Sequence, residues 1–293
     1  MSSTAKAAVL CVFACAFFAI ANALGKAAQT VLPGPELHPL QVTAARFLAG
    51  FAALLPWLVW RGPRVFRTAV PLHHLLRVLL GAIAVTCIFA ALQRLPLAEV
   101  LAIAWSAPLF AVLFAAWFLR ERVDGIRALA TLAGFVGVAV MLQPSGAGLA
   151  PIALLALVAA VCTGAEVVMI RVLARTDPAL TVLALNNALG AIVAVAATSV
   201  VYVTPSPQQA WALAGVGATM VAGQALFMRA LWVAEASVVA PFYYATLAWA
   251  ALIGVVVFDE VPGWHLYFGG ALVVAGGLLV GARSGGRRPS AQE

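Results

Sequence analysis

The sequence predicts an all-α integral membrane protein with ten transmembrane helices, built as two inverted five-helix repeats. Three observations predict this fold: the composition, the spacing of the apolar segments and the placement of the basic residues. The chain has 293 residues, of which 65% are hydrophobic and 9% are charged, and its mean hydropathy is +1.06. Soluble domains carry about 25% charged residues, so a water-soluble fold could not bury this much apolar surface.

Ten apolar segments follow one another along the chain, each near the roughly 20 residues that a helix needs to cross a bilayer. Prolines, glycines or charged residues separate them, and the predicted spans are 7–30, 40–60, 73–93, 98–119, 125–143, 151–171, 179–202, 209–231, 237–258 and 264–282. The turn clusters at 33–35, 143–146 and 204–207 would not continue a helix. Because lipid does not tolerate exposed irregular backbone, we expect these turns at the membrane surfaces.

The first span imitates a cleavable signal peptide, because Lys6 precedes an apolar stretch that ends at Ala21-Asn22-Ala23. We expect the segment to stay in the protein, since the distribution of basic residues needs it as the first span.

The basic residues alternate between the predicted loops. With a cytoplasmic N-terminus, fourteen of the 17 lie on the cytoplasmic side: Lys6, Arg61, Arg64, Arg67, Arg77, Arg120, Arg122, Arg127, Arg171, Arg175, Arg229, Arg283, Arg287 and Arg288. Lys26, Arg46 and Arg94 lie elsewhere. This bias predicts that both termini are cytoplasmic, that the chain lies in the cell inner (plasma) membrane, and that residues 284–293 form a disordered cytoplasmic tail.

The two halves of the chain share an order of features. Sliding residues 91–142 by 139 positions aligns seven identical residues, among them Glu121 with Glu260. Each half holds five predicted spans, an odd number, so the second half must enter the membrane from the opposite side. The sequence therefore predicts a unit at 1–145 (spans 1–5) and a unit at 146–283 (spans 6–10), related by a pseudo-twofold axis in the membrane plane. Glycines in spans 5 and 10 favour close helix packing.

Short segments in both halves carry a resemblance. They are Asn22-Ala23-Leu24-Gly25-Lys26, Arg46-Phe47-Leu48-Ala49-Gly50, and 91–99, 107–108 and 120–122 in the first half, and 230–231, 236–241 and 259–260 in the second. With these segments, nearly the whole chain resembles the EamA-domain branch of the drug/metabolite transporter (DMT) superfamily. The resemblance implies two EamA units around a central cavity that work by alternating access. Members of this branch export amino acids and other metabolites, or take up compounds such as riboflavin or S-adenosylmethionine. The second half departs from the pattern with Leu247 in place of Pro108.

Charged residues inside a span are candidates for function, because each costs about 2.5–3.5 kcal/mol at the bilayer centre. Lys26 follows Asn22 by four residues, so both lie on one helical face. Lys26 could hold a substrate carboxylate, pair with a carboxylate of the protein, or snorkel to the outer interface. Arg46, about two turns into span 2, could line the cavity as an anion site or tie its helix to another span.

Two carboxylates are plausible partners for Arg46: Glu99 at the outer entrance of span 4 and Glu166 in the inner part of span 6. Either could also couple transport to protons, because a buried carboxyl group can exchange a proton near neutral pH. Glu166 is the stronger candidate, because a position at the membrane interface is enough to explain a charged residue at Glu99. Gln224 on span 8 is the intramembrane amide that we include in the site.

Prolines and aromatic residues coincide in two spans. Span 4 holds Trp105 and Pro108, and span 9 holds Pro241, Tyr243 and Tyr244. Proline bends a helix, and in transporters such breaks lie where helices line the cavity. The aromatic rings could stack on a planar or cationic ligand, or they could belong to the interfacial belt.

These features predict a secondary transporter of a small organic metabolite, amino-acid-like or related, that exports its cargo by alternating access. An uptake carrier for a vitamin or nucleoside-like metabolite and an intramembrane enzyme are the alternatives. Catalytic residues, cofactors and metals are not expected, because neither His-Glu-x-x-His nor Gly-x-Ser-x-Gly occurs in the chain and its four cysteines lack metal-ligand spacing. The expected partners are the substrate, the lipid bilayer and a proton as the candidate coupling ion. A homodimer is compatible with the sequence, and nucleic acid is not expected.

Overall fold

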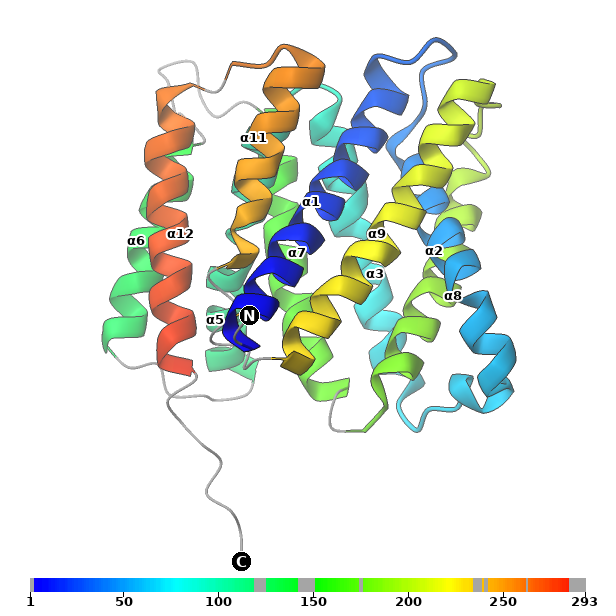
Figure 1. The fold of residues 1–293 in the computed structure, drawn as a ribbon, viewed down its shortest axis with the longest axis horizontal. Helices are drawn as coiled ribbons and strands as arrows, with labels where there is room; N and C mark the ends of the chain where they lie inside the picture. Colours follow the sequence, from blue (N-terminus) through cyan, green and yellow to red (C-terminus); the bar gives the residue numbers. More distant parts are fainter. Residues whose placement is uncertain are drawn as a thin grey trace, which may run out of the picture.

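The computed structural model describes residues 3–118, 125–141, 151–173, 176–233, 239, 242–261 and 263–284. These residues form a helical bundle whose helices stand side by side (Figure 1). The helices are α1 (Ser3–Thr30), α2 (Pro39–Arg61), the short 3-10 helix η1 (Pro63–Phe66), α3 (Pro71–Leu92), α4 (Leu97–Ala104), α5 (Ala107–Phe118), α6 (Gly125–Met141), α7 (Pro151–Leu173), α8 (Ala179–Thr198), α9 (Pro207–Val233), α11 (Ala245–Phe258) and α12 (Trp264–Ser284).

Among the described residues, 7 helical segments are long and apolar enough to cross a membrane, and one of them joins α4 to α5. Shorter apolar helices cover Thr131–Val140, Ala245–Phe258 and Trp264–Ala275. Each predicted span overlaps one of these segments, and the turn cluster at 33–35 lies between α1 and α2 as expected. The protein is therefore an all-helical membrane protein, and the count of ten crossings stays a prediction.

Proline sets the start of several helices. α2, α3, α7 and α9 each begin on proline, which is tolerated in the first turn because the missing N–H would have no helical acceptor there. At the start of α2, the Nδ1 atom of His38 accepts the backbone N–H of Leu40 at 3.2 Å. At the end of α11, Asp259 adopts the left-handed conformation (φ 53°) and the N–H of Glu260 donates to the carbonyl of Gly254. This turn directs Glu260 toward the bundle, where it takes part in a buried ion pair.

Each contact between a helix of one half and a helix of the other has a counterpart in which the two halves change places. α1 packs on α9 and α11, and correspondingly α7 packs on α3 and α5; α2 packs on α8, and α6 packs on α12. In Figure 1, α6 and α12 stand at one end of the bundle, α2 and α8 at the other, and the exchanged pairs lie between them. This pairing fits the two-repeat architecture, and it shows that the halves interlock rather than fold as separate bodies.

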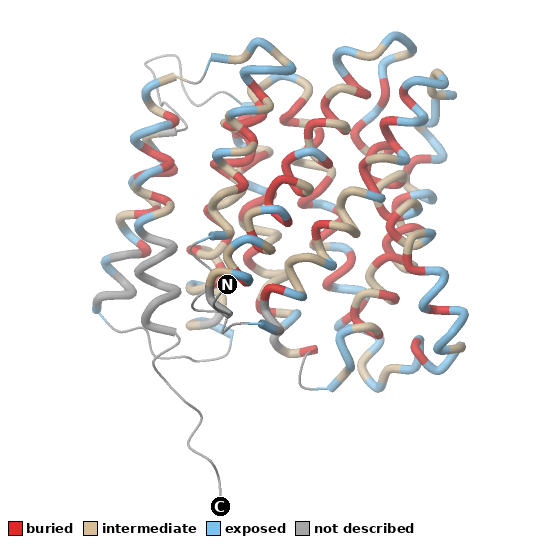
Figure 2. Tube along the Cα trace, in the orientation of Figure 1, coloured by how far each residue is buried: buried red, intermediate tan, exposed pale blue. Residues whose placement is uncertain are grey.

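Burial follows the same arrangement. Figure 2 shows the buried residues where helices face one another and the exposed residues on the outer surfaces and the connecting turns. Trp57, Trp60, Trp211 and Trp264 are all more than half exposed. In a soluble protein this many exposed tryptophans would be unusual, whereas at a bilayer surface they form an aromatic belt.

Replacing Gly137 of α6 with alanine is expected to destabilise the fold by about 1–3 kcal/mol. An added Cβ would lie 2.6 Å from the backbone oxygen of Gly269 in α12, and such an atom can move only if the helix moves. Thermal unfolding in detergent measures the effect. Gly270→Ala is the matched control, because no atom lies within 4 Å of its added Cβ and alanine favours a helix. Equal melting temperatures for the two variants would contradict the predicted close packing of these glycine-rich helices.

Candidate functional site

The fourth span is broken at Trp105 and Ser106, between α4 and α5. The N–H of Trp105 still bonds to the Leu101 carbonyl at 2.8 Å, but the N–H of Ser106 turns to the Ile103 carbonyl at 3.0 Å. The Ser106 hydroxyl donates to the same carbonyl at 2.7 Å. Pro108 lies in the first turn of α5, where it needs no N–H. The break thus precedes the proline, and the partly buried Trp105 ring packs against the apolar core. Pro241, the matching prediction, lies outside the described residues.

Four aromatic rings meet at this break, and we call them the aromatic cluster: Phe18, Trp105, Phe227 and Tyr243. The ring centroids of Trp105 and Tyr243 are 4.3 Å apart at an interplanar angle of 84°, and those of Phe227 and Tyr243 are 4.7 Å apart. Phe18 contacts Tyr243 edge to face at 6.0 Å. The rings come from α1, the end of α4, α9 and the segment before α11, so the cluster joins both halves of the chain.

Three charged side chains from α2, α3 and α7 form a second group, which we call the charged triad: Arg46, Arg77 and Glu166. The guanidinium of Arg77 lies 3.4 Å from the Glu166 carboxylate, and these side chains are 8% and 19% exposed. Arg77 also donates to the Val182 carbonyl at 3.3 Å. Arg46 interacts electrostatically with Glu166 and with Tyr243 of the aromatic cluster. Among the described residues, one carboxylate therefore faces two cations at this place.

Glu166 reaches α3 because Gly81 has no side chain. A Cβ on Gly81 would lie 3.3 Å from the nearer carboxylate oxygen of Glu166, tighter than an ordinary van der Waals contact. The sequence analysis offered Arg46 as a partner of Glu166 and counted Arg77 among the basic residues on the cytoplasmic side. The structure adds Arg77 as a partner of Glu166, since it lies about two turns into α3 and is 7% exposed.

Lys26 forms a buried ion pair with Glu260 at the end of α1. Its ammonium group contacts the Glu260 carboxylate and donates to the Leu95 carbonyl at 2.6 Å. The second oxygen of Glu260 accepts the N–H of Leu97 at 2.7 Å, and the two charged side chains are 9% and 14% exposed. Of the three alternatives for Lys26, the structure shows pairing within the protein. The pair joins the end of α1, the start of α4 and the turn between α11 and α12.

The other predicted residues fall near one of these groups. Asn22 donates to the carbonyl of Phe18 at 2.8 Å, next to the aromatic cluster. Gln224 lies one turn before Phe227 on α9 and is partly exposed, and its side chain makes no hydrogen bond with a described residue. Glu99 interacts electrostatically with His265, Glu260 and Lys26, so it belongs to the Lys26 end and not to Arg46. Tyr244 is the residue before α11 and is partly exposed.

Sequence reasoning missed Arg77 and Glu260 as members of these groups. For Glu260 a signal existed, since the repeat alignment placed it on Glu121. For Arg77 the signal was its depth inside an apolar segment. Within the described part of the chain, no group of three His, Cys, Asp or Glu side chains could hold a metal ion.

A separate polar contact closes the opposite face of the bundle. The Nε2 atom of His74, at the start of α3, donates to the Asp177 carboxylate at 2.7 Å, and the Thr68 hydroxyl donates to the same oxygen at 2.7 Å. Burial raises the pKa of Asp177, but the hydrogen bonds from His74 and Thr68 outweigh it, so this pKa lies below its ordinary value. The contact ties the turn between α7 and α8 to α3.

Replacing Asp177 with asparagine is expected to lower the melting temperature at pH 7. Because the folded-state pKa is depressed, the ionised carboxylate stabilises the fold above the unfolded pKa of about 4, and this stabilisation is lost as the pH falls through the folded value. The difference between the parent and Asp177→Asn should therefore shrink below about pH 4. Asp259→Asn is the control, since Asp259 is exposed and asparagine tolerates its left-handed conformation. A difference independent of pH would contradict the role of the carboxylate.

Two interlocking helical halves, with opposed charges and a broken helix inside the bundle, define an integral membrane transporter. The chain belongs to the EamA-like transporter family, whose sequence profile matches residues 5–143 and again residues 150–282.

Named relatives agree with this class. A riboflavin transporter of Rhizobium johnstonii is 34% identical over 81% of this chain and 80% of its own. A pseudopaline exporter, CntI, of Pseudomonas aeruginosa is 29% identical over 93% of this chain and 92% of its own. An S-adenosylmethionine uptake transporter of Rickettsia bellii is 26% identical over 84% and 85% of the two chains. A crystal structure of a protein 25% identical to this chain superposes with a TM-score of 0.62 over 96% of this chain and 99% of that one.

Proposed function

We propose that the protein is a secondary carrier that exports a small, amino-acid-like organic metabolite by alternating access. In this proposal the chain crosses the inner membrane ten times, in units 1–145 and 146–283, with both termini in the cytoplasm. The observation that carries the proposal is the charged triad beside the aromatic cluster, at a point where helices of both halves meet.

The charged triad favours an anionic group on the cargo. Arg46 and Arg77 bring two positive charges to one carboxylate, Glu166, in a segment that the bilayer surrounds. An uncompensated charge in such a place is costly, and a carboxylate of the cargo would neutralise it. Arg46 and Glu166 both keep part of their surface exposed, although they lie inside their spans. The Arg46 side chain makes no hydrogen bond or ion pair with a described residue, and a charged, accessible group of this kind suits a transient ligand.

The Lys26–Glu260 pair supports alternating access. It holds three elements together at the end of α1, so the site is closed on that face. Transport requires the same face to open at another stage of the cycle, and breaking one ion pair with its two backbone hydrogen bonds would release α4 from α1 and from the α11–α12 turn. We infer that this pair is the gate of that face, and that the opposite face opens when the pair is formed.

A proton is the proposed coupling ion, and Glu166 is the proposed carrier of it. When Glu166 is ionised it balances Arg77, and when it is protonated both arginines are free to hold an anion. Protonation would thus change the charge available to the cargo.

The names of the relatives favour two directions of transport. The pseudopaline exporter aligns over 93% of this chain, which supports export. Uptake of a vitamin or nucleoside-like metabolite is the second candidate, favoured by the 34% identity with a riboflavin transporter. The alternative of an intramembrane enzyme and the homodimer both stay predictions.

Counterflow in liposomes tests the proposal. The purified protein is reconstituted and loaded with each member of a panel of amino acids, riboflavin, S-adenosylmethionine and amines, and exchange of labelled compound is measured with and without a pH gradient. Protein-free liposomes are the control. Saturable exchange of an amino-acid-like compound is expected. Exchange of riboflavin or S-adenosylmethionine alone would favour the uptake carrier, and hydrolysis of a lipid or peptide without any exchange would overturn the transporter proposal.

A further inference from the structure

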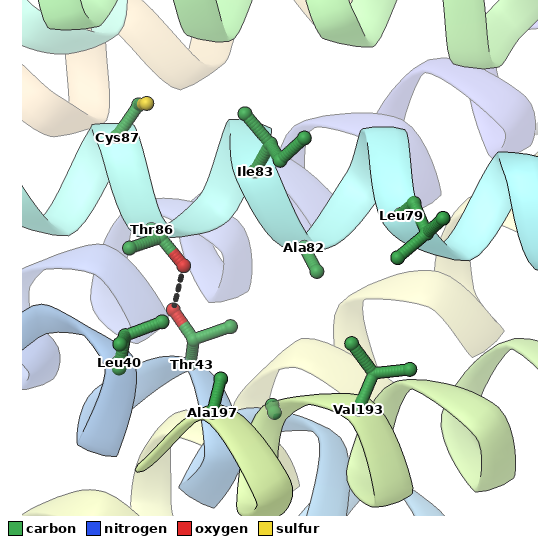
Figure 3. Close-up of a pocket in the computed structure, with 10 residues that line it drawn as sticks. Leu40, Thr43, Leu79, Ala82, Ile83, Thr86, Cys87, Val193 and Ala197 are labelled. Carbon is green, nitrogen blue, oxygen red and sulfur yellow. Dashed lines mark hydrogen bonds between the residues drawn. The ribbon is translucent and has the colours of Figure 1, made fainter. Parts of the chain in front are cut away.

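A pocket of about 250 Å³ opens between α2, α3 and α8, on elements other than those that carry the aromatic cluster. Figure 3 shows Leu40 and Thr43 on one side of it, Ile83, Thr86 and Cys87 on another, and Ala197 on the third. The pocket therefore lies where two helices of the first half meet one of the second.

The interior of this pocket offers no free polar donor. The Thr43 hydroxyl donates to the Pro39 carbonyl at 3.1 Å, and the Thr86 hydroxyl, 3.0 Å away, donates to the Thr43 oxygen. The remaining lining side chains are aliphatic, apart from the thiol of Cys87. A ligand that gains stability here must be a hydrocarbon, because a polar group would lose its water and find no partner.

The mouth of the pocket faces the bilayer. Thr43 is fully buried and forms the floor, whereas Leu79 and Ile83 at the rim are 39% and 48% exposed. Exposed aliphatic side chains on a transmembrane helix meet lipid, so the hydrocarbon that can enter from this side is an acyl chain.

An exposed cation, Arg94, lies two residues beyond Leu92, the last residue of α3. Its backbone N–H still bonds to the Ala91 carbonyl at 3.0 Å, so the chain continues to turn here, and the seven residues from Cys87 bring Arg94 back toward the side of α3 that carries Cys87. Cys87 therefore lies about 10 Å deeper than Arg94 at 1.5 Å per residue, within the roughly 15 Å that one leaflet's hydrocarbon spans. Gln93 donates to the Leu37 carbonyl at 3.1 Å, which holds this end of α3 against the segment that leads into α2.

Arg94 is also an exception to the distribution of basic residues. On the face that the sequence predicts to be external, Lys26 is buried in its ion pair with Glu260. The Arg94 side chain is exposed, and it makes no hydrogen bond or ion pair with any residue that the structure describes. An arginine at the outer surface can pair with an anion, and the phosphate of a phospholipid stands at this height.

We propose that this pocket, together with Arg94 beyond the end of α3, binds one phospholipid of the outer leaflet. Arg94 pairs with its phosphate, and one acyl chain fills the pocket between α2, α3 and α8. The proposal rests on the membrane orientation of the chain and not on the identity of the cargo. Because α2 and α3 belong to one half and α8 to the other, the bound chain would brace the two halves against each other.

Native mass spectrometry of delipidated protein, titrated with 1-palmitoyl-2-oleoyl phosphatidylglycerol, tests this site. One bound lipid is expected on the parent protein. Ala197→Phe should weaken binding on the order of tenfold or more, because the ring displaces several methylenes from the pocket. Ala196→Phe is the matched control, since Ala196 is the exposed neighbour and does not line the pocket. Arg94→Gln should weaken binding about fivefold, whereas Arg94→Lys should retain it.

Equal binding by Ala197→Phe and the parent would overturn the pocket as the acyl site, and undiminished binding by Arg94→Gln would overturn the phosphate contact. A second measurement uses a native cysteine and needs no variant. Cys87 lines the pocket, so added phosphatidylglycerol should slow its alkylation by a small maleimide. Unchanged alkylation of Cys87 would contradict the proposal.

Discussion

Replacing Glu166 with glutamine is expected to abolish accumulation driven by a pH gradient while counterflow persists. Glutamine keeps the size of the side chain and its contact with α3 near Gly81, but it cannot take up or release a proton. A carrier with such a change still exchanges cargo, because exchange needs only the movement of the loaded site between the two faces. The measurement compares gradient-driven uptake with counterflow in the same proteoliposomes, at two values of external pH.

Glu99→Gln is the matched control for this experiment, since Glu99 lies at the Lys26 end and outside the charged triad. It should retain gradient-driven transport. Loss of counterflow as well in Glu166→Gln would assign Glu166 to cargo binding or to structure, because removing one partner of a buried charge pair costs about 3–5 kcal/mol. The melting temperature separates these two outcomes. Unchanged pH dependence in Glu166→Gln would remove its coupling role.

Replacing Lys26 with methionine should destabilise the protein by about 3–5 kcal/mol, since the Glu260 carboxylate would stay buried without a cation. Transport should fall together with stability, because the face at the end of α1 no longer closes. Glu260→Gln should have a similar effect through the unpaired ammonium group. The double variant Lys26→Met with Glu260→Gln removes both charges of the pair. Its loss of stability should therefore be well below the sum of the losses in the two single variants.

Thermal unfolding of the parent, the two single variants and the double variant in the same detergent provides this comparison. Counterflow shows whether the gate still works. The double variant should regain stability without regaining transport, because a gate without its ion pair is held only by apolar contacts. Lys6→Met is the control on the same helix, since Lys6 is exposed, and it should change neither quantity. Additive losses in the double variant would show that Lys26 and Glu260 do not act as a pair. Full transport in the double variant would remove the pair as the gate.

The class and the layout of this protein follow from the sequence alone. Hydrophobic length is a local property, so the apolar segments and their proline starts predict helices such as α2 and α3 within two residues. The family resemblance rests on short contiguous segments for the same reason. The sequence predicts the inverted pairing of the halves by counting, because an odd number of spans would reverse the second unit, and the exchange of helix partners is compatible with this prediction.

The partners of the charged residues were decided by tertiary structure. Lys26 and Glu260 are separated by 234 positions, and no local pattern shows which of several carboxylates a buried cation will meet. Arg77 lies about two turns into α3, and its sequence neighbours do not show that α7 brings Glu166 to it. Trp105 and Tyr243 suggested a cavity individually, but only packing shows that they share one cluster with Phe18 and Phe227. Hydrophobic periodicity places a helix in the membrane, whereas its rotation and its neighbours depend on contacts between distant segments.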